Sequence, residues 1–288
     1  MTEKNQALVR FGPAGHSQSF HDMGYKDSLS TADYLVKMGL NAYEYQCGRG
    51  VNIGEEKAAE LGRRCAAADI RLSLHAPYYI SMASADEEKR LHSIDYILQS
   101  ARAVRAMGGD RIVIHPGATG KMPREDAVAL AADTFRLALK ALDDEGLSHI
   151  RLCPETMGKL GQLGTLDEVL HFCALDERFI PCIDFGHLNA RTQGGLRTMA
   201  DFEAVFTGIR DRLGESRLKE FHAHISKIEY TQGGERCHLT FADEQYGPDY
   251  RPILELTHRY DCRPTLICES AGTQAEDAAT MKAYYESL

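Results

Sequence analysis

The stretch RIVIHPG (111–117) is a short apolar run, mostly β-branched, that ends on a histidine. The same pattern, with His, Asp or Glu at its C-terminal end, recurs in LSLHAP (72–77), IRLCPET (150–156), IPCIDFGH (180–187), KEFHAHISK (219–227) and PTLICES (264–270). Short runs of this kind, separated by helical stretches, are typical of buried parallel strands. The repetition therefore predicts an α/β protein with a parallel sheet.

Strands and helices are expected to alternate along the whole chain. We expect strands near residues 7–11, 42–46, 71–75, 111–115, 149–155, 179–184, 220–225 and 264–269. We expect helices near 31–39, 54–68, 86–107, 123–145, 166–173, 199–213, 250–259 and 273–287. Such alternation favours closure into a barrel over an open sheet, and no GxGxxG motif follows the first strand. The sequence thus predicts a single-domain (β/α)8 TIM barrel over residues 1–288.

Composition narrows the class of protein. The hydrophobic fraction of 43% and the charged fraction of 26% are ordinary for a globular protein. A net charge of −9 argues against a general nucleic-acid coat protein, although bound cations can still admit DNA to an enzyme site. No secretory leader, membrane span or CxxC pair is visible, and the eight cysteines are expected to be reduced. We therefore expect a cytoplasmic protein, and a monomer.

The side chains at the strand ends form a set of candidate metal ligands. In a barrel, all strand ends of one polarity meet at a single rim, where such enzymes carry their catalytic groups. Buried unpaired carboxylates are costly, so three of them at one rim need cations or basic partners. The sequence therefore predicts a metal site at the C-terminal rim, with the ligands His75, His115, Glu155, Asp184, His222 and Glu269.

Some candidate ligands have competing interpretations. Asp184 and His187 form a D-x-x-H pair that could face one ion or two adjacent ions, with His187 otherwise supporting the ligands. His222 and His224 share one strand parity, and we favour His222 as the ligand and His224 as a supporting residue. His238, in the long connection after the seventh strand, is either another ligand or a solvated histidine.

The donor set suggests the metal and its number. Imidazoles and carboxylates without committed thiolates suit Zn²⁺, with Mn²⁺ or Fe²⁺ as alternatives. More than four ligands imply more than one ion, so two or three ions are expected. Two ions that share a carboxylate are a common apparatus for in-line displacement at phosphorus.

Together these motifs resemble the endonuclease IV family, the three-zinc apurinic/apyrimidinic endonucleases of the xylose-isomerase-like TIM barrels. The resemblance rests on HAPYYI (75–80), VIHPG (113–117), PETMGKLGQLGT (154–165), CIDFGHLNAR (182–191), HAHISK (222–227) and CESAG (268–272). It implies a DNA-repair hydrolase that cuts DNA 5′ to abasic sites with metal-bound hydroxide, using Glu155 and Glu269 as catalytic carboxylates.

The resemblance also implies an arrangement of ligands. His75, His115 and Glu155 would hold the first zinc, and Glu155 would bridge to a second. Asp184, His222 and Glu269 would complete the second site. His187 would hold a third zinc with two ligands of the seventh connection, for which Glu235 and His238 are the candidates. Tyr78 matches a family tyrosine near the DNA, and Arg49 is the candidate DNA contact in the loop after the second strand.

The sequence departs from the family pattern in two places, which concern the third zinc site and a DNA-contacting loop. The family's third-zinc motif is Asp-x-His, whereas Glu235 and His238 are separated by one residue more, which leaves open whether the third site is intact. The loop 46–50 lacks the bulky residues that typical members insert into DNA. The competing function is a sugar isomerase or epimerase on the same fold, with one ion and paired carboxylates for proton transfer on a small sugar.

Overall fold

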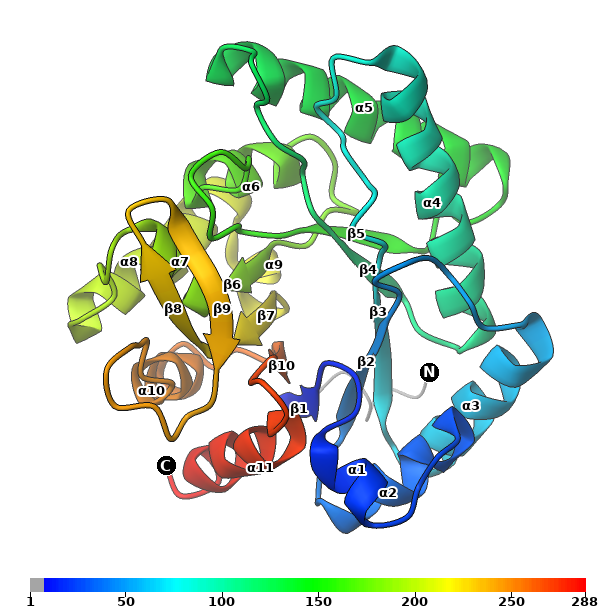
Figure 1. Ribbon diagram of the computed structural model, residues 1–288, viewed down its shortest axis with the longest axis vertical. Coiled ribbons are helices and arrows are strands. Elements are labelled where there is room, and N and C mark those ends of the chain that lie inside the picture. The colour runs from blue at the N-terminus through cyan, green and yellow to red at the C-terminus, as the bar shows by residue number, and fades with distance from the viewer. Residues whose placement is uncertain (1–7) are drawn as a thin grey trace.

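The computed structural model describes residues 8–288, whose strands form a parallel barrel (Figure 1). The barrel strands are β1 (Arg10–Pro13), β2 (Ala42–Gln46), β3 (Arg71–His75), β4 (Arg111–Ile114), β5 (Arg151–Pro154), β6 (Cys182–Asp184), β7 (His222–Ile225) and β10 (Thr265–Cys268). They pair as β2-β3-β4-β5 and β1-β10-β7-β6, and single bridges at Ala14–Glu44 and Glu155–Cys182 join the two groups. The predicted (β/α)8 TIM barrel is confirmed. Residue 7 of the expected first strand lies outside the described residues.

Helices surround the strands, as Figure 1 shows. The eight expected helices are α2 (Thr31–Lys37), α3 (Glu55–Ala67), α4 (Glu87–Ala106), α5 (Arg124–Asp144), α6 (Leu166–Cys173), α8 (Met199–Leu213), α10 (Arg251–Arg259) and α11 (Gln274–Tyr285). Short additional helices are α1 (Gln18–Asp22), the 3₁₀ helix η2 (Ser28–Ser30), α7 (Phe185–Arg191) and α9 (Glu215–Lys219). None of the helices within residues 8–288 combines the length and the apolar character that a membrane crossing requires.

Local sequence explains where these helices begin and which face they bury. The Thr165 hydroxyl accepts the Glu168 N–H, and the Glu168 carboxylate accepts the Thr165 N–H, which makes a capping box at the start of α6. Along α5, Ala127, Ala131 and Phe135 recur at helical spacing and are fully buried. Each helix therefore packs one apolar face on the barrel.

The connection after β7 contains a hairpin that the sequence analysis did not predict. β8 (Lys227–Thr231) pairs antiparallel with β9 (Gly234–Leu239), and both lie beside α7 (Figure 1). The sequence carried a signal for it, since an alternating run ends at Gly233-Gly234, a dipeptide typical of hairpin turns. This hairpin extends the C-terminal rim beyond the barrel strands.

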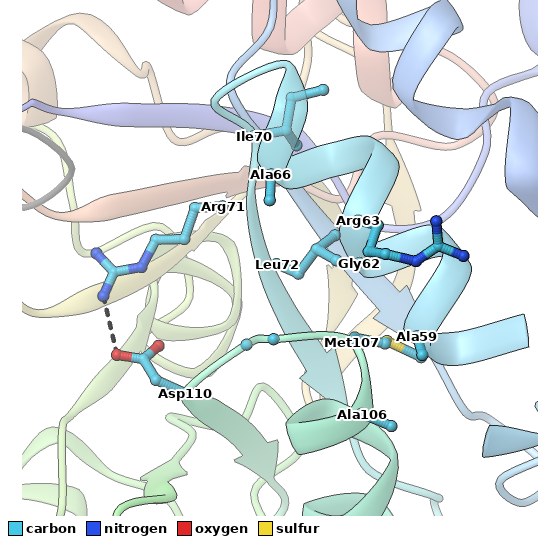
Figure 2. Close-up of a pocket in the computed structure, with 12 residues that line it drawn as sticks. Ala59, Gly62, Arg63, Ala66, Ile70, Arg71, Leu72, Ala106, Met107 and Asp110 are labelled. Atoms are coloured by element: carbon cyan, nitrogen blue, oxygen red, sulfur yellow. Dashed lines mark hydrogen bonds and ion pairs between the residues drawn. The ribbon is translucent and has the colours of Figure 1, made fainter. Parts of the chain in front are cut away.

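The opposite end of the barrel carries a cluster of arginines, of which Arg111 is buried and Arg71 and Arg151 are partly buried. Arg71, Arg111 and Arg151 begin three successive strands and surround the carboxylate of Asp110. Arg71 Nη2 lies 3.0 Å from Asp110 Oδ2, at the edge of a cavity of about 340 Å³ between α3 and the turn before β4 (Figure 2). Burial raises the pKa of Asp110, but the three guanidinium groups outweigh it and hold that pKa well below its usual range.

We predict that Asp110→Asn lowers the free energy of unfolding by about 3–5 kcal/mol at pH 7, because it leaves the buried guanidinium of Arg111 and its partly buried neighbours uncompensated. Since the pKa of Asp110 is depressed by folding, this contribution is present above the unfolded pKa of about 3.9 and is lost as the pH falls through the folded pKa. Urea denaturation at pH 7 and at acidic pH measures both effects.

Asp69→Asn is the matched control. Its carboxylate pairs with the buried Arg10 at 3.2 Å but is 58% exposed, and Arg10 also donates to the Asp69 carbonyl oxygen at 2.7 Å. Asparagine keeps that second contact, so the loss should be smaller than for Asp110→Asn. Asp69 has a φ of 55°, a conformation that asparagine tolerates, so the substitution adds no backbone strain. Equal losses in the two variants would contradict the role assigned to Asp110.

Candidate metal centre

The candidate ligands meet in one cavity at the C-terminal rim of the barrel. The cavity has a volume of about 360 Å³, and its walls include His75, His115, His187, His238 and Glu269. These residues are separated by as many as 194 positions in sequence, and parallel strand ends bring them together as expected. Four groups of His, Cys, Asp and Glu among the described residues place their ligand atoms within 4.8 Å of one another.

The first group consists of His75, His115 and Glu155, from the ends of β3, β4 and β5. Glu155 Oε2 lies 3.4 Å from His75 Nε2 and 3.0 Å from His115 Nε2. The Nδ1 of His75 donates to the carbonyl oxygen of Ala76 at 2.9 Å, which leaves a lone pair on Nε2 for an ion. Burial lowers the pKa of His75, but the Glu155 carboxylate outweighs it and raises that pKa to about 9.

The second group consists of Glu155, Asp184, His224 and Glu269. His224 Nδ1 lies 3.0 Å from Glu155 Oε1 and 3.5 Å from Glu269 Oε2. Burial raises the pKa of Asp184 to about 7, and repulsion from Glu269 and Glu155 acts in the same direction. Three carboxylates so close together favour a bound cation, which would keep them all ionised. Glu155 belongs to both groups, as a bridging ligand must.

The assignment of the two histidines of β7 is reversed in the structure. His224 lies beside Asp184 in the strand register, whereas His222 lies beside Cys182, one layer deeper in the barrel. His222 Nε2 faces the carboxylate of Glu44 at 3.0 Å instead of the rim. Both histidines occupy alternate positions of β7, as expected, and so share one face of the strand. Alternation alone does not reveal which of the two lies nearer the rim.

The third group consists of His187 on α7 and Glu235 and His238 on β9. His187 Nε2 lies 3.4 Å from Glu235 Oε2. The Nδ1 of His187 donates to the carbonyl oxygen of Thr156 at 3.0 Å, so its Nε2 lone pair faces the group. Burial lowers the pKa of His187, but Asp184 and Glu155 outweigh it and raise that pKa to about 10.

A β-bulge explains how Glu235 and His238 share one face. Residues three apart on a regular strand point to opposite faces of the sheet. The pairing of β9 with β8 is irregular between Cys237 and Glu235, which leaves Arg236 as an extra residue. The bulge compensates the wider spacing, so the departure from Asp-x-His does not separate the two side chains.

Orphaned polar atoms show that the donor set fits metal ions. Among the described residues, Glu155 Oε2 and Asp184 Oδ2 are buried and have no hydrogen-bond partner. Glu155 Oε2 is nevertheless 3.0 Å from His115 Nε2, so the contact is short but badly directed for a hydrogen bond. A cation held by these atoms would account for the arrangement, because their lone pairs would then point at the ion.

Glu44 is a buried acid of this region that the sequence analysis missed. It lies inside β2, and its carboxylate accepts from the Ser73 hydroxyl at 2.9 Å. Burial raises the pKa of Glu44, but His224 and His222 outweigh it and hold that pKa well below its usual range. The available signal was an acid at the centre of a strand expected to be buried, in AYEYQ (42–46).

The two candidate substrate residues occupy different places. Tyr78 lines the cavity, is 60% exposed, and stacks on His115 with ring centroids 5.7 Å apart. Arg49 is exposed in the loop after β2 and does not line this cavity. Tyr78 can therefore contact a ligand in the cavity, whereas Arg49 can reach only a longer one.

A TIM barrel with several groups of potential metal ligands at its C-terminal rim has the architecture of a barrel enzyme. The family model described as "Xylose isomerase-like TIM barrel" matches residues 32–286, so the chain belongs to that family. An uncharacterized protein of Methanocaldococcus jannaschii is 33% identical over 98% of both chains. A probable endonuclease 4 of Streptomyces avermitilis is 29% identical over 77% of this chain and 72% of its own length.

Solved structures share the fold with this chain. Endonuclease IV from Thermus thermophilus superposes with a TM-score of 0.65 and 16% identity, over 97% of this chain and all of its own. A D-tagatose 3-epimerase-like protein gives a TM-score of 0.70, also at 16% identity, over 97% of both chains. These likenesses establish the barrel, and the choice between hydrolase and epimerase depends on the site.

We predict that His238→Ala lowers the bound metal by one equivalent, because it removes an imidazole of the third group. Deletion of Arg236 should leave the metal content unchanged, since a regular strand with two-residue spacing also places Glu235 and His238 on one face. Elemental analysis of purified, metal-loaded protein measures both. Loss of the ion on deleting Arg236 would contradict this account of the bulge.

Proposed function

We propose that this protein is a metal-dependent phosphodiesterase that cleaves DNA 5′ to abasic sites. The observation that carries the proposal is the presence of three ligand groups around one cavity, more than a single-ion isomerase requires. Zn²⁺ ions bound there would supply Lewis-acid activation of water and charge stabilisation at phosphorus. The endonuclease 4 relatives are consistent with this reaction.

Three residues of the chain would have separate roles in the reaction at phosphorus. Glu155 would fix the distance between the first two groups, because its two oxygens face His115 and His224 at 3.0 Å each. Glu269 is at the cavity wall, where its carboxylate can accept a proton from attacking water. Tyr78 would pack against the sugar-phosphate at the mouth of the cavity.

The shape of the cleft supports an extended substrate. A second cavity of about 310 Å³ adjoins the first and shares Tyr78, His238 and Glu269 with it. Its wall continues over Gln46, at the end of β2, and Gln274, at the start of α11. A small sugar needs only one such cavity, whereas a DNA strand would occupy both.

The charged rim residues fall into two sets. Arg191 donates to the carbonyl oxygens of Met157 and Lys159, and Arg236 contacts the Glu229 carboxylate at 2.5 Å, so both have internal roles. Lys159 lines the first cavity, Arg49 lies in the loop after β2, and both residues are exposed. These two are the candidates for phosphate contacts, despite the net charge of −9.

We predict that the zinc-loaded protein nicks a duplex carrying one abasic analogue, leaves a 3′-hydroxyl and spares the intact duplex. Glu155→Gln should abolish nicking with the fold retained, because the amide cannot carry the charge that holds two ions. Gel analysis of the products and circular dichroism measure these outcomes. An inert protein that instead exchanges a C2 or C3 proton of a ketose with solvent would establish the epimerase alternative.

We predict that Arg49→Ala and Lys159→Ala each weaken binding to abasic DNA and flatten its salt dependence by about one unit of slope per lost phosphate contact. Arg236→Ala is the matched control, because its guanidinium is engaged by Glu229, and it should change neither property. Fluorescence anisotropy over a salt series, with Glu155→Gln as the inactive background, gives the slopes. Unchanged slopes for both cleft variants would remove these residues from the DNA surface.

A further inference from the structure

A second set of potential ligands lies beneath the rim cavity. Cys182, His222 and His224 place their ligand atoms within 4.8 Å of one another. The carboxylate of Glu44 is not part of this group but contacts both histidines, with Oε2 3.0 Å from His222 Nε2 and Oε1 2.9 Å from His224 Nε2. All four residues are fully buried, and they come from the adjacent strands β6 and β7 and from β2 across the barrel.

The polar atoms of this set are not satisfied by one another. Neither nitrogen of His222 has a hydrogen-bond partner among the described residues, and the same is true of His224 Nε2. The distances to Glu44 suit hydrogen bonds, but the directions do not. The same short, misdirected contact occurs in the rim groups between His115 and Glu155. Buried imidazole nitrogens without partners are costly, so something else should bind them.

We propose that Cys182, His222 and His224 bind a further divalent transition-metal ion, one layer below the rim cluster, with the Glu44 carboxylate beside the two imidazoles. One thiolate and two imidazoles suit a tetrahedral Zn²⁺ or Co²⁺ ion. The thiol of Cys182 gives up its proton on binding, as metal-ligating cysteines do. This ligand group shares His224 with the rim, but its occupancy does not require the reaction proposed above.

His224 would connect this deep site to the rim. Its Nδ1 faces Glu155 and Glu269, whereas its Nε2 faces Glu44. If each nitrogen of His224 bound an ion, the neutral imidazole would have to release its one N–H proton to solvent. Occupancy of the two sites is therefore linked, and the deep ion fixes the orientation of a rim ligand.

The competing account is that Glu44 only accepts hydrogen bonds and orients His224 for a rim ion. The two accounts differ in sulfur coordination, because only the deep site involves Cys182. Cobalt(II) reports this directly, since thiolate ligation gives a ligand-to-metal charge-transfer band that imidazole and carboxylate ligation lack. The experiment uses the full chain, stripped of metal and titrated with Co²⁺.

We expect the charge-transfer band in the wild-type protein and its loss in Cys182→Ser, together with one equivalent of metal. Two matched controls should keep the band. Cys153→Ser alters a buried thiol on the neighbouring strand β5, outside the ligand group, and Cys237→Ser alters an exposed thiol beside His238. X-ray absorption of the wild type should show a sulfur scatterer at about 2.3 Å, which keeps the test valid if Cys182→Ser fails to fold.

Two results would overturn the proposal. One is a fully loaded wild type without a thiolate band or a sulfur scatterer, and the other is a band that persists in Cys182→Ser. Neither depends on nuclease activity. A protein that nicks abasic DNA without thiolate ligation loses only the deep site, and a protein with thiolate ligation but no nicking loses only the proposed reaction.

Discussion

The buried carboxylate of Glu155 is the constraint on which the site depends. Four imidazoles, of His75, His115, His187 and His224, lie within 3.4 Å of its oxygens. A buried carboxylate costs several kcal/mol without compensation. Here β3, the end of β4, β7 and helix α7 supply the imidazoles that compensate it. The position of β5 between β4 and β6 is what makes such sharing feasible. Any ion in the rim groups must be arranged around this one side chain.

Three strands carry an arginine at one end of the barrel and a candidate metal ligand at the other end. RLSLH (71–75), RIVIH (111–115) and RLCPE (151–155) each place arginine, a smaller residue and a candidate ligand at alternate positions. Period-two geometry sends those three residues into the barrel in successive layers. Arginines around Asp110 therefore close one end, small side chains fill the middle, and ligands line the other end. Glu44 pairs with Ser73 in the strand register, so this acid lies at the level of the middle layer, beneath the rim ligands.

Sequence patterns predicted the features that follow from the periodicity of apolar residues. They missed the features that follow from strand register or from the depth of a side chain in the barrel. The strands, the eight main helices and the convergence of rim ligands follow from apolar runs and strand polarity. The choice between His222 and His224 required the stagger between β6 and β7, which is a tertiary property. The pairing of Glu235 with His238 required a bulge at Arg236, which spacing alone argues against. Glu44 was overlooked because a single acid in an apolar strand does not reveal which distant side chains it contacts, here His222 and His224.

The barrel and the function are decided by different parts of the chain. Endonuclease IV and an epimerase-like protein both share the fold with this chain, so the strands cannot distinguish the two reactions. The third ligand group comes from α7 and the β8–β9 hairpin, which lie outside the eight-stranded barrel. Gly158 allows this approach, because a Cβ there would lie 2.5 Å from the Glu235 side chain. Close packing of the loop after β5 against the hairpin thus assembles the third group, and that group is the feature on which the proposed phosphodiesterase reaction depends.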